Sequence, residues 1–410
     1  MGTLAGSVVI ALTALSEANW LTAARVRRIG VVFAVMAVIF FSADVWLHTR
    51  AGVTDASGEQ LGRDFVNYWA GARMAAEHRA PSVYDVKAFV SFQRAHTSAH
   101  ANFKWYSYPP MTLLLSLPLA IMSFKAGFAF WLVAGWAACT ALLKRMLNWP
   151  MAALAGFATP ASFLNALSGQ NGQFSAALLC GGVLMLGSRP LVAGTLFGLL
   201  CFKPHLAVLV PVALAAGGYW RAFGAAAFTA LAITAVSALL FGQDTWAAFL
   251  HNAPINALLM EQGTDFWHRM PTVFAMIRLA GGNIALAYGV QIASALVAAF
   301  LTARIWRSQT TIARKGAALV LATFLTTPYA WDYDLVSLTF VAAWLVADGL
   351  QNGFRSWEKL LLAITVAMPL IITSMANQSH IQIAPLILGG MLLQTLRGAA
   401  TQNQNRLAVA

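Results

Sequence analysis

Long apolar stretches, broken by short polar ones, make up most of this chain. The first clear stretch covers residues 29–47, and further ones follow from residue 108 to residue 396. A membrane-spanning segment needs about 20 apolar residues and must pair its backbone polar groups within itself, which favours a helix. We therefore predict one all-α, polytopic membrane domain over residues 1–410.

Several apolar stretches are too short to cross a bilayer alone, for example residues 174–186 and 191–202. We expect these to be half-helices, re-entrant segments or helices extended by their flanks. The topology between Lys144 and Lys203 stays open, because the basic residues of this region do not alternate consistently between the two sides.

Basic residues near both ends of the chain indicate its orientation, because Lys and Arg gather on the cytoplasmic side of membrane proteins. They stand directly before the first span and in the tail 397–410, which has no acidic residue: Arg25, Arg27, Arg28, Arg397 and Arg406. Two cytoplasmic ends require an even number of crossings, and we predict about twelve. The polar segment 48–107 then lies outside the cytoplasm.

Two amphipathic helices are predicted within the polar segment 48–107. The apolar residues of the first recur at helical spacing: Phe65, Trp69, Ala72 and Ala76. The second opens near Pro81, where Ser82 and Asp85 fit a capping box, and Phe89 and Phe92 then share one face. Helices of this kind lie in the membrane interface rather than across it.

Composition supports the membrane assignment. The chain is 59% hydrophobic and only 10% charged, whereas soluble domains carry about 25% charged residues. The net charge of +12 comes from short basic runs between the spans, which set orientation, so nucleic acid is not expected as a partner. Cys139, Cys180 and Cys201 lie in apolar stretches without metal-ligand spacing and are predicted to be small core residues.

Asp64 is the leading candidate for a catalytic group. It lies in the polar segment, beside an aromatic cluster, where a membrane enzyme would meet a lipid-borne substrate. A carboxylate there could act as a general base. Asp is also favoured at helix N-caps, so Asp64 could instead cap the helix that begins at Phe65. Residue types alone leave both roles open.

Other polar residues interrupt the apolar regions. Gln170 and Asn171 belong to a run of amides that could cap two helix ends or hold a hydroxyl-rich substrate. Lys203 precedes Pro204 and His205 between two spans, where it could be functional or extend to the lipid headgroups, while His205 is more typical of a core residue.

Two carboxylates, Asp332 and Asp334, follow a span near the C-terminal third of the chain. They could bind a sugar, a metal ion or a structural arginine, although their spacing is poor for a shared metal. Arg269 lies in another loop and is explained adequately by solvation.

Taken in order, five segments resemble those of glycosyltransferase family 87: GRDFVNYWAGA, YSYPPM, SGQNGQ, CFKPH and TPYAWDYD. This family comprises polytopic transferases that use polyprenyl-phosphate-linked sugars, including mannosyltransferases. The resemblance implies a GT-C fold and assigns the catalytic base to Asp64. One departure is that the family commonly has Trp-Asp-His-His where this chain has Trp-Asp-Tyr-Asp, so a catalytic role of Asp332 and Tyr333 is in doubt.

The resemblance implies transfer of a hexosyl group, with mannosyl the first choice, from a polyprenyl-phosphate donor to a hydroxyl of a glycolipid or glycan, with inversion. Lys203, with Arg63 and Arg269 behind it, would meet the charge of the leaving phosphate. The remaining substrate contacts are expected from eight residues: Trp69, Tyr68, Tyr108, Gln170, Asn171, His205, Asp332 and Tyr333.

No metal or other cofactor is expected. The protein is predicted to lie in the bacterial cytoplasmic membrane, in contact with membrane lipids, with its site outside the cytoplasm. The alternative is a transporter or flippase for a lipid-linked sugar or a small solute, since intramembrane polar groups and half-helices would serve it too. The long segment that holds Asp64 favours the enzyme.

Overall fold

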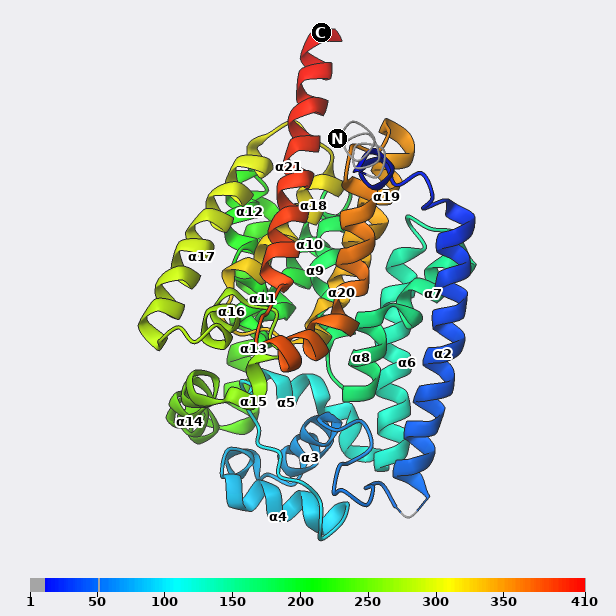
Figure 1. Ribbon diagram of the computed structural model, residues 1–410. Coiled ribbons are helices and arrows are strands. Elements are labelled where there is room, and N and C mark those ends of the chain that lie inside the picture. The colour runs from blue at the N-terminus through cyan, green and yellow to red at the C-terminus, as the bar shows by residue number, and fades with distance from the viewer. Residues whose placement is uncertain (1–11, 51, 410) are drawn as a thin grey trace.

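The computed structural model describes residues 12–50 and 52–409. In these residues every named element of secondary structure is a helix (Figure 1). An isolated bridge between Thr54 and Gln60 is the one β-type pairing found there. The prediction of an all-α polytopic protein is confirmed.

Six helical spans are long and apolar enough to cross a membrane. Five are single helices: α2 (Ala23–Thr49), α6 (Phe124–Leu143), α13 (Trp220–Phe241), α17 (Ile284–Arg307) and α20 (Glu358–Ser379). The sixth is the continuous span Asp332–Asn352, which joins η4 (Asp332–Ser337) to α19 (Leu338–Asn352). A seventh arises if α7 (Trp149–Ala158) and α8 (Pro160–Ser168), bent by 52° at their junction, count as one span. The predicted number of about twelve crossings stays a prediction, because several remaining helices are shorter.

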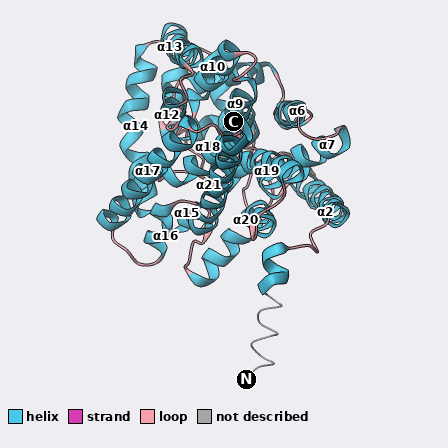
Figure 2. Cartoon of the chain, turned by 90° about the horizontal axis from the view of Figure 1, so that it is seen from above, coloured by secondary structure: helices cyan, strands magenta, loops and turns pink. Residues whose placement is uncertain are grey.

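The outer helices expose their apolar side chains. Only 6% of the most apolar window of α2, and of α13, is buried, and Phe228 and Leu239 of α13 are 74% and 84% exposed. Seen from above, α2, α13 and α17 lie at the edge while α9 (Gly172–Met185) and α18 (Ile312–Thr326) lie in the middle (Figure 2). Apolar surface of this extent needs lipid around it, so the chain is an integral membrane protein.

Several of the shorter apolar helices have one end inside the molecule. The region left open between Lys144 and Lys203 consists of the bent pair α7–α8, then α9, then α10 (Pro190–Leu199) with η3 (Leu200–Phe202). It is followed by α11 (Pro204–Ala207) and α12 (Val210–Ala216). The ends of α8 and α9 meet η4, so helix termini with their polar groups gather in the interior.

Close packing of α10 on α13 shows how a short helix is held. Gly194 and Gly198 lie one turn apart on α10, and a Cβ on either would come within 2.5 Å of a backbone oxygen of α13. Small residues at this spacing let two membrane helices approach closely.

The polar segment forms α3 (Phe65–Ala76), η1 (Ala80–Val83) and α4 (Val86–His96). The first predicted helix is present, but nearly all of α3 is buried, so its predicted surface position is corrected. The second helix begins later than expected. Asp85 is its N-cap, with the carboxylate accepting from the Ala88 N–H, and does not complete a capping box with Ser82. Phe89 and Phe92 share the buried face, as predicted.

The remaining helices complete the bundle: α5 (Met111–Ser116) with η2 (Leu117–Ile121), α14 (Gln243–Gln262), α15 (Thr264–Trp267), α16 (Val273–Leu279) and α21 (Ala384–Val409). The sequence pattern missed α14. The start of α2 and the C-terminal half of α21 lie at one end of the molecule, and α3, α4 and α14 at the other (Figure 1). The start of α2 and the end of α21 thus lie on the same side of the molecule.

Candidate active site

Asp64 lies where two tight turns meet. Gly62 and Arg63 both have positive φ, +65° and +42°, and turn the chain into α3. The Asp64 N–H donates to the Ser168 carbonyl at 3.2 Å. A Cβ at Gly169 would lie 2.4 Å from the Gly62 carbonyl oxygen, so the turn between α8 and α9 must present a glycine here. Two segments that are distant in sequence are thereby locked together.

The Asp64 carboxylate does not cap α3. Asp64 stands at the N-cap position but its side chain makes no capping hydrogen bond. Instead, Oδ2 accepts a hydrogen bond of 2.9 Å from Gln170 Nε2, and Oδ1 lies 3.5 Å from Lys104 Nζ. The side chain is 25% exposed. Of the two roles left open by the sequence, helix capping is therefore not the one that the carboxylate fills.

Gln170 joins Asp64 to a pair of tyrosines. The hydroxyls of Tyr68 and Tyr108 lie 2.6 and 2.9 Å from Gln170 Oε1 and 2.6 Å from each other. Burial raises the pKa of both phenols well above the ordinary value, and the negative charge of Asp64 acts in the same direction. Both groups therefore stay protonated and can donate. The Trp131 ring stacks on Tyr68, and its indole N–H donates to the backbone carbonyl of Gln170 at 3.3 Å.

Arg269 is held beside this cluster by Asp332. Its Nε and Nη2 donate to the two carboxylate oxygens at 3.0 and 2.9 Å, a forked pair that fixes the guanidinium plane. Burial would lower the pKa of Arg269, but the charge of Asp332 raises it more, and Tyr333 and Asp64 add to this effect. The side chain stays 31% exposed. A permanent cation thus stands within the electrostatic reach of Asp64.

Lys203 forms a buried ion pair with Asp334. The other Asp334 oxygen accepts from the Trp331 N–H at 3.0 Å. Asp332 and Asp334 therefore point to different cations rather than to a common point. In the described residues no group of three His, Cys, Asp or Glu side chains could hold a metal ion, and metal independence stays a prediction.

The other predicted site residues lie in different surroundings. Arg63 Nη2 pairs with Asp44 Oδ1 at 2.9 Å, at the end of α2. The Trp69 indole is buried and donates to the Met122 carbonyl at 3.0 Å. The His205 ring packs edge-on against Tyr329 at 5.3 Å.

Asn171 and Tyr333 border the central cluster. The Asn171 amide is buried and its two polar atoms have no hydrogen-bond partner among the described residues. The Tyr333 ring stacks on Trp331 at 5.9 Å and lies under the Lys203 ammonium. An unpaired buried amide is costly, so Asn171 is a predicted contact with free hydrogen-bonding capacity, as is His205, whose Nε2 also has no partner among the described residues.

Sequence reasoning missed Lys104 and Trp131. Lys104 Nζ lies 3.3 Å from a Glu59 oxygen as well as 3.5 Å from Asp64, and so shares its charge between two carboxylates. Its position among several basic residues of the polar segment gave no signal. Trp131 lies inside an apolar span, where an indole is ordinary.

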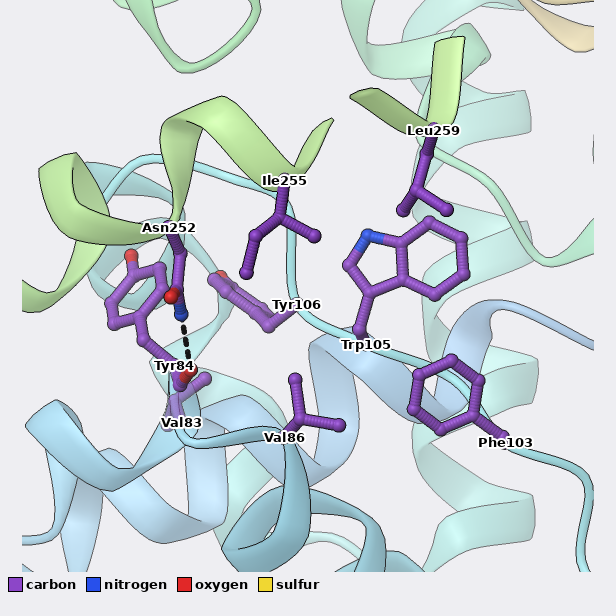
Figure 3. A pocket seen from close by; sticks show the side chains of 9 residues that line it. All are labelled: Val83, Tyr84, Val86, Phe103, Trp105, Tyr106, Asn252, Ile255 and Leu259. Carbon is purple, nitrogen blue, oxygen red and sulfur yellow. Dashed lines mark hydrogen bonds between the residues drawn. The ribbon is translucent and has the colours of Figure 1, made fainter. Parts of the chain in front are cut away.

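A pocket of about 150 Å³ lies between the polar segment and α14 (Figure 3). Its walls are mainly apolar, and the Asn252 amide closes one side by donating to the Tyr84 carbonyl. The lining residues are Val83, Tyr84, Val86, Phe103, Trp105, Tyr106, Asn252, Ile255 and Leu259. Tyr106 packs edge-on against Tyr108 at 5.7 Å, so one ring separates the pocket from the residues around Gln170.

Comparison with known protein families gives a match over the middle of the chain. The sequence model of glycosyltransferase family 87 matches residues 106–328, more than half of the 410 residues. The chain belongs to glycosyltransferase family 87. No curated protein and no solved structure matches it. The resemblance noted from the sequence is therefore confirmed, while the GT-C fold stays a prediction.

The match to family 87 covers Tyr108, the Gln170 turn, Lys203 and Arg269. It begins after Asp64 and ends before Asp332. The chain is a membrane glycosyltransferase by family, and the role of Asp64 depends on its geometry within the site.

Proposed function

We propose that this family 87 protein transfers a hexosyl group, with mannosyl the first choice, from a polyprenyl-phosphate donor to a hydroxyl of a glycolipid or glycan. The site would face the outside of the cytoplasm, because the arginines in the first two turns of α2 (Arg25, Arg27 and Arg28) belong to the start of that helix, at the opposite end of the molecule. The observation that carries the proposal is the Asp64 carboxylate, which is partly open and held by Gln170 and Lys104 rather than used as a helix cap.

In this reaction the acceptor oxygen attacks the anomeric carbon from the face opposite the leaving group. The bond from that carbon to the phosphate oxygen breaks, the configuration inverts, and polyprenyl phosphate leaves with the bonding electron pair. Asp64 takes the proton of the acceptor hydroxyl. Positioned base catalysis of this kind contributes typically about 10²–10⁴-fold to a rate. A transporter would need no such base, which is why the carboxylate favours the enzyme.

Arg269 is the cation best suited to the leaving phosphate. Its charge is permanent, its plane is fixed by Asp332, and almost a third of its side chain remains exposed. Lys203 was the first choice from the sequence, but its ammonium is buried and already paired with Asp334. A preorganised cation near developing negative charge lowers the barrier without reorganisation at the moment of reaction.

The apolar pocket beside Tyr106 would take the first part of the polyprenyl chain. Only a phosphate separates this chain from the anomeric carbon, so its first carbons must lie near the site. An apolar cavity of about 150 Å³ accepts a group of benzene size, comparable with one isoprene unit. Walls of Val86, Ile255 and Leu259 suit a hydrocarbon and not a charged headgroup.

Release of polyprenyl phosphate from labelled polyprenyl-phosphate-mannose by the purified protein tests the function. Asp64→Asn keeps the size of the side chain and one acceptor oxygen, which can serve Gln170 or Lys104 but not both, and it cannot take a proton. We expect turnover to fall about 10²–10⁴-fold, with the midpoint of thermal unfolding within about 2 °C of the wild type. Normal turnover in Asp64→Asn would remove this residue from the mechanism. Transport of the lipid-linked sugar without bond cleavage would favour a transporter over an enzyme.

Filling the pocket tests its assignment. Ile255→Trp should raise KM for the donor about tenfold while leaving KM for the acceptor unchanged. Leu258→Trp is the matched control, because Leu258 lies on the same helix, is half exposed and does not line the pocket. An increase confined to the acceptor KM would assign the pocket to the acceptor instead.

A further inference from the structure

Every polar atom of the Gln170 side chain is already engaged by the protein. Its Oε1 lies within hydrogen-bond distance of the Tyr68 and Tyr108 hydroxyls, and its Nε2 donates to Asp64 Oδ2. The residue is 3% exposed. A side chain in this state has little left to offer a sugar hydroxyl, which was the role expected from the sequence.

The partners also fix which way the amide points. An ionised carboxylate only accepts hydrogen bonds, so the amide nitrogen must face Asp64. The carbonyl oxygen then faces the two hydroxyls, which are held protonated by burial. A flipped amide would place two acceptors against each other at 2.9 Å and NH₂ against the tyrosine pair. The Asp64 carboxylate thus selects one orientation of the Gln170 amide, and the Tyr68 and Tyr108 hydroxyls hold the carbonyl oxygen of that orientation.

We propose that Gln170, held by Tyr68 and Tyr108, is a positioning residue that aims the Asp64 carboxylate. This inference rests on the proposed function, because it assigns the support of the same base. Gln170 touches Asp64 rather than the reacting atoms. The amide donor favours the charged carboxylate, and the tyrosines prevent the amide from rotating away.

The other groups that face Asp64 act in parallel and do not replace this contact. Lys104 lies 3.5 Å from Oδ1, but its charge is shared with Glu59. The further groups that share an electrostatic interaction with Asp64 are Tyr68, Tyr108, Lys203, Arg269, Tyr329 and Tyr333. Lys203 and Arg269 are each paired with another carboxylate. The hydrogen bond from Gln170 Nε2, at 2.9 Å, is the shortest described side-chain contact of the Asp64 carboxylate.

The test compares two glutamines that lie three positions apart, Gln170 in the turn before α9 and Gln173 at the start of α9. Gln170→Leu removes the donor to Asp64. Gln173→Leu is the matched control, because Gln173 is equally buried and, among the described residues, its amide donates to the Gly156 carbonyl and not to Asp64. In Gln170→Leu we expect kcat to fall about tenfold with KM little changed. The acidic limb of the pH–rate profile should move up by about one pH unit, the size expected for a lost hydrogen bond to a charged group.

A charged variant of Gln170 should increase the shift of the acidic limb of the pH–rate profile. Gln170→Glu sets a second carboxyl group against Asp64, and two neighbouring carboxylates resist joint ionisation. The acidic limb should move further up than in Gln170→Leu. Gln173→Leu should leave the limb in place, whatever it does to the yield of folded protein.

Removing the tyrosine hydroxyls tests the orientation. The double variant Tyr68→Phe/Tyr108→Phe should reproduce part of the Gln170→Leu shift. Combined with Gln170→Leu it should add almost nothing, because the hydroxyls act through the amide. Additive effects in this cycle would show that the tyrosines act separately from Gln170.

A readout independent of turnover separates this inference from the function. The infrared band of the protonated Asp64 carboxyl, identified by its loss in Asp64→Asn, can be followed against pH in each variant. If the wild type transfers no sugar, the proposed function fails, yet a higher midpoint of this band in Gln170→Leu still supports the positioning role. If the wild type is active and both the band and the acidic limb are unchanged in Gln170→Leu, the inference alone is overturned.

Discussion

Carboxylates are treated differently at the two ends of this molecule. Near the starts of α18 and α20, Arg314 is fully buried, pairs with Asp348 and lies 3.3 Å from Glu358 Oε1. Its Nη1 also donates to the Thr395 carbonyl, so four helices, α18 to α21, meet at one guanidinium. At the other end, Asp64 faces a neutral amide and a shared lysine, and a quarter of its side chain is exposed.

The difference separates structural from chemical carboxylates. Asp348 and Glu358 are neutralised in place by Arg314 together with Arg355, whose Nη1 lies 3.9 Å from Glu358 Oε2, and they are excluded from solvent, so a proton or a substrate has no access to them. A buried pair of this kind constrains packing, and breaking it is costly. Asp64 lacks an arginine partner and keeps an open side, and both features suit a group that must accept a proton. A buried carboxylate whose charge is fully neutralised by arginine therefore indicates a structural role. A carboxylate that is partly exposed and only partly neutralised, like Asp64, indicates a chemical role.

Arg314→Met should have the largest effect on stability. It would leave Asp348 buried without its arginine and Glu358 with Arg355 alone, at a cost of about 3–5 kcal/mol, and lower the midpoint of thermal unfolding in detergent by several degrees. Arg145→Met is the control, because Arg145 is exposed and its described side-chain contact is to the Met185 sulfur. An Arg314→Met protein as stable as the control would remove the contrast between the two ends.

Lys104→Arg sharpens the same comparison from the other side. A guanidinium could clamp Asp64 through two parallel hydrogen bonds, as Arg269 clamps Asp332. We expect turnover to fall about tenfold without loss of thermal stability, because the base would then resemble a structural carboxylate. Lys87→Arg, on the exposed side of α4, provides the control. Unchanged turnover in Lys104→Arg would show that loose pairing of Asp64 is not required.

The sequence predicted elements better than it predicted contacts. The repeat of Phe65, Trp69 and Ala72 located α3, and the amide run marked the turn that reaches Asp64. It missed that α3 is buried on nearly all sides, because the covering residues come from η2, α5 and α6. Lys104 was not singled out because its contact with Asp64 spans 40 positions through an irregular segment.

The pairing of charges was also beyond the sequence. Lys203 was ranked above Arg269 for the donor phosphate because it lies at membrane depth, yet it faces Asp334 across 131 positions. No local pattern encodes such a partner. The helix α14 was missed for a related reason, since its polar residues break the apolar run and its packing against η1 is tertiary.

Asp55 offers the smallest and most local test, because it is a carboxylate near the site that is held by hydrogen bonds rather than by an arginine. Burial would raise its pKa, but hydrogen bonds from the Ser57 hydroxyl and the Ser57 and Glu59 N–H groups lower it below the ordinary value of 3.8. A lowered folded-state pKa contributes stability above about pH 4 that is lost as the pH falls through the folded value.

Asp55→Asn should therefore destabilise the protein at pH 7 by about 1 kcal/mol or less, since the group is partly exposed. The difference from the wild type should shrink between about pH 5 and pH 3. Thermal unfolding across this range measures it. The acidic limb of the pH–rate profile should stay in place in Asp55→Asn, since this carboxylate shapes the loop and takes no proton from the acceptor. A shift of that limb as large as in Gln170→Leu would mean that the limb reports loop stability, and Asp64 would lose its distinction from the structural carboxylates.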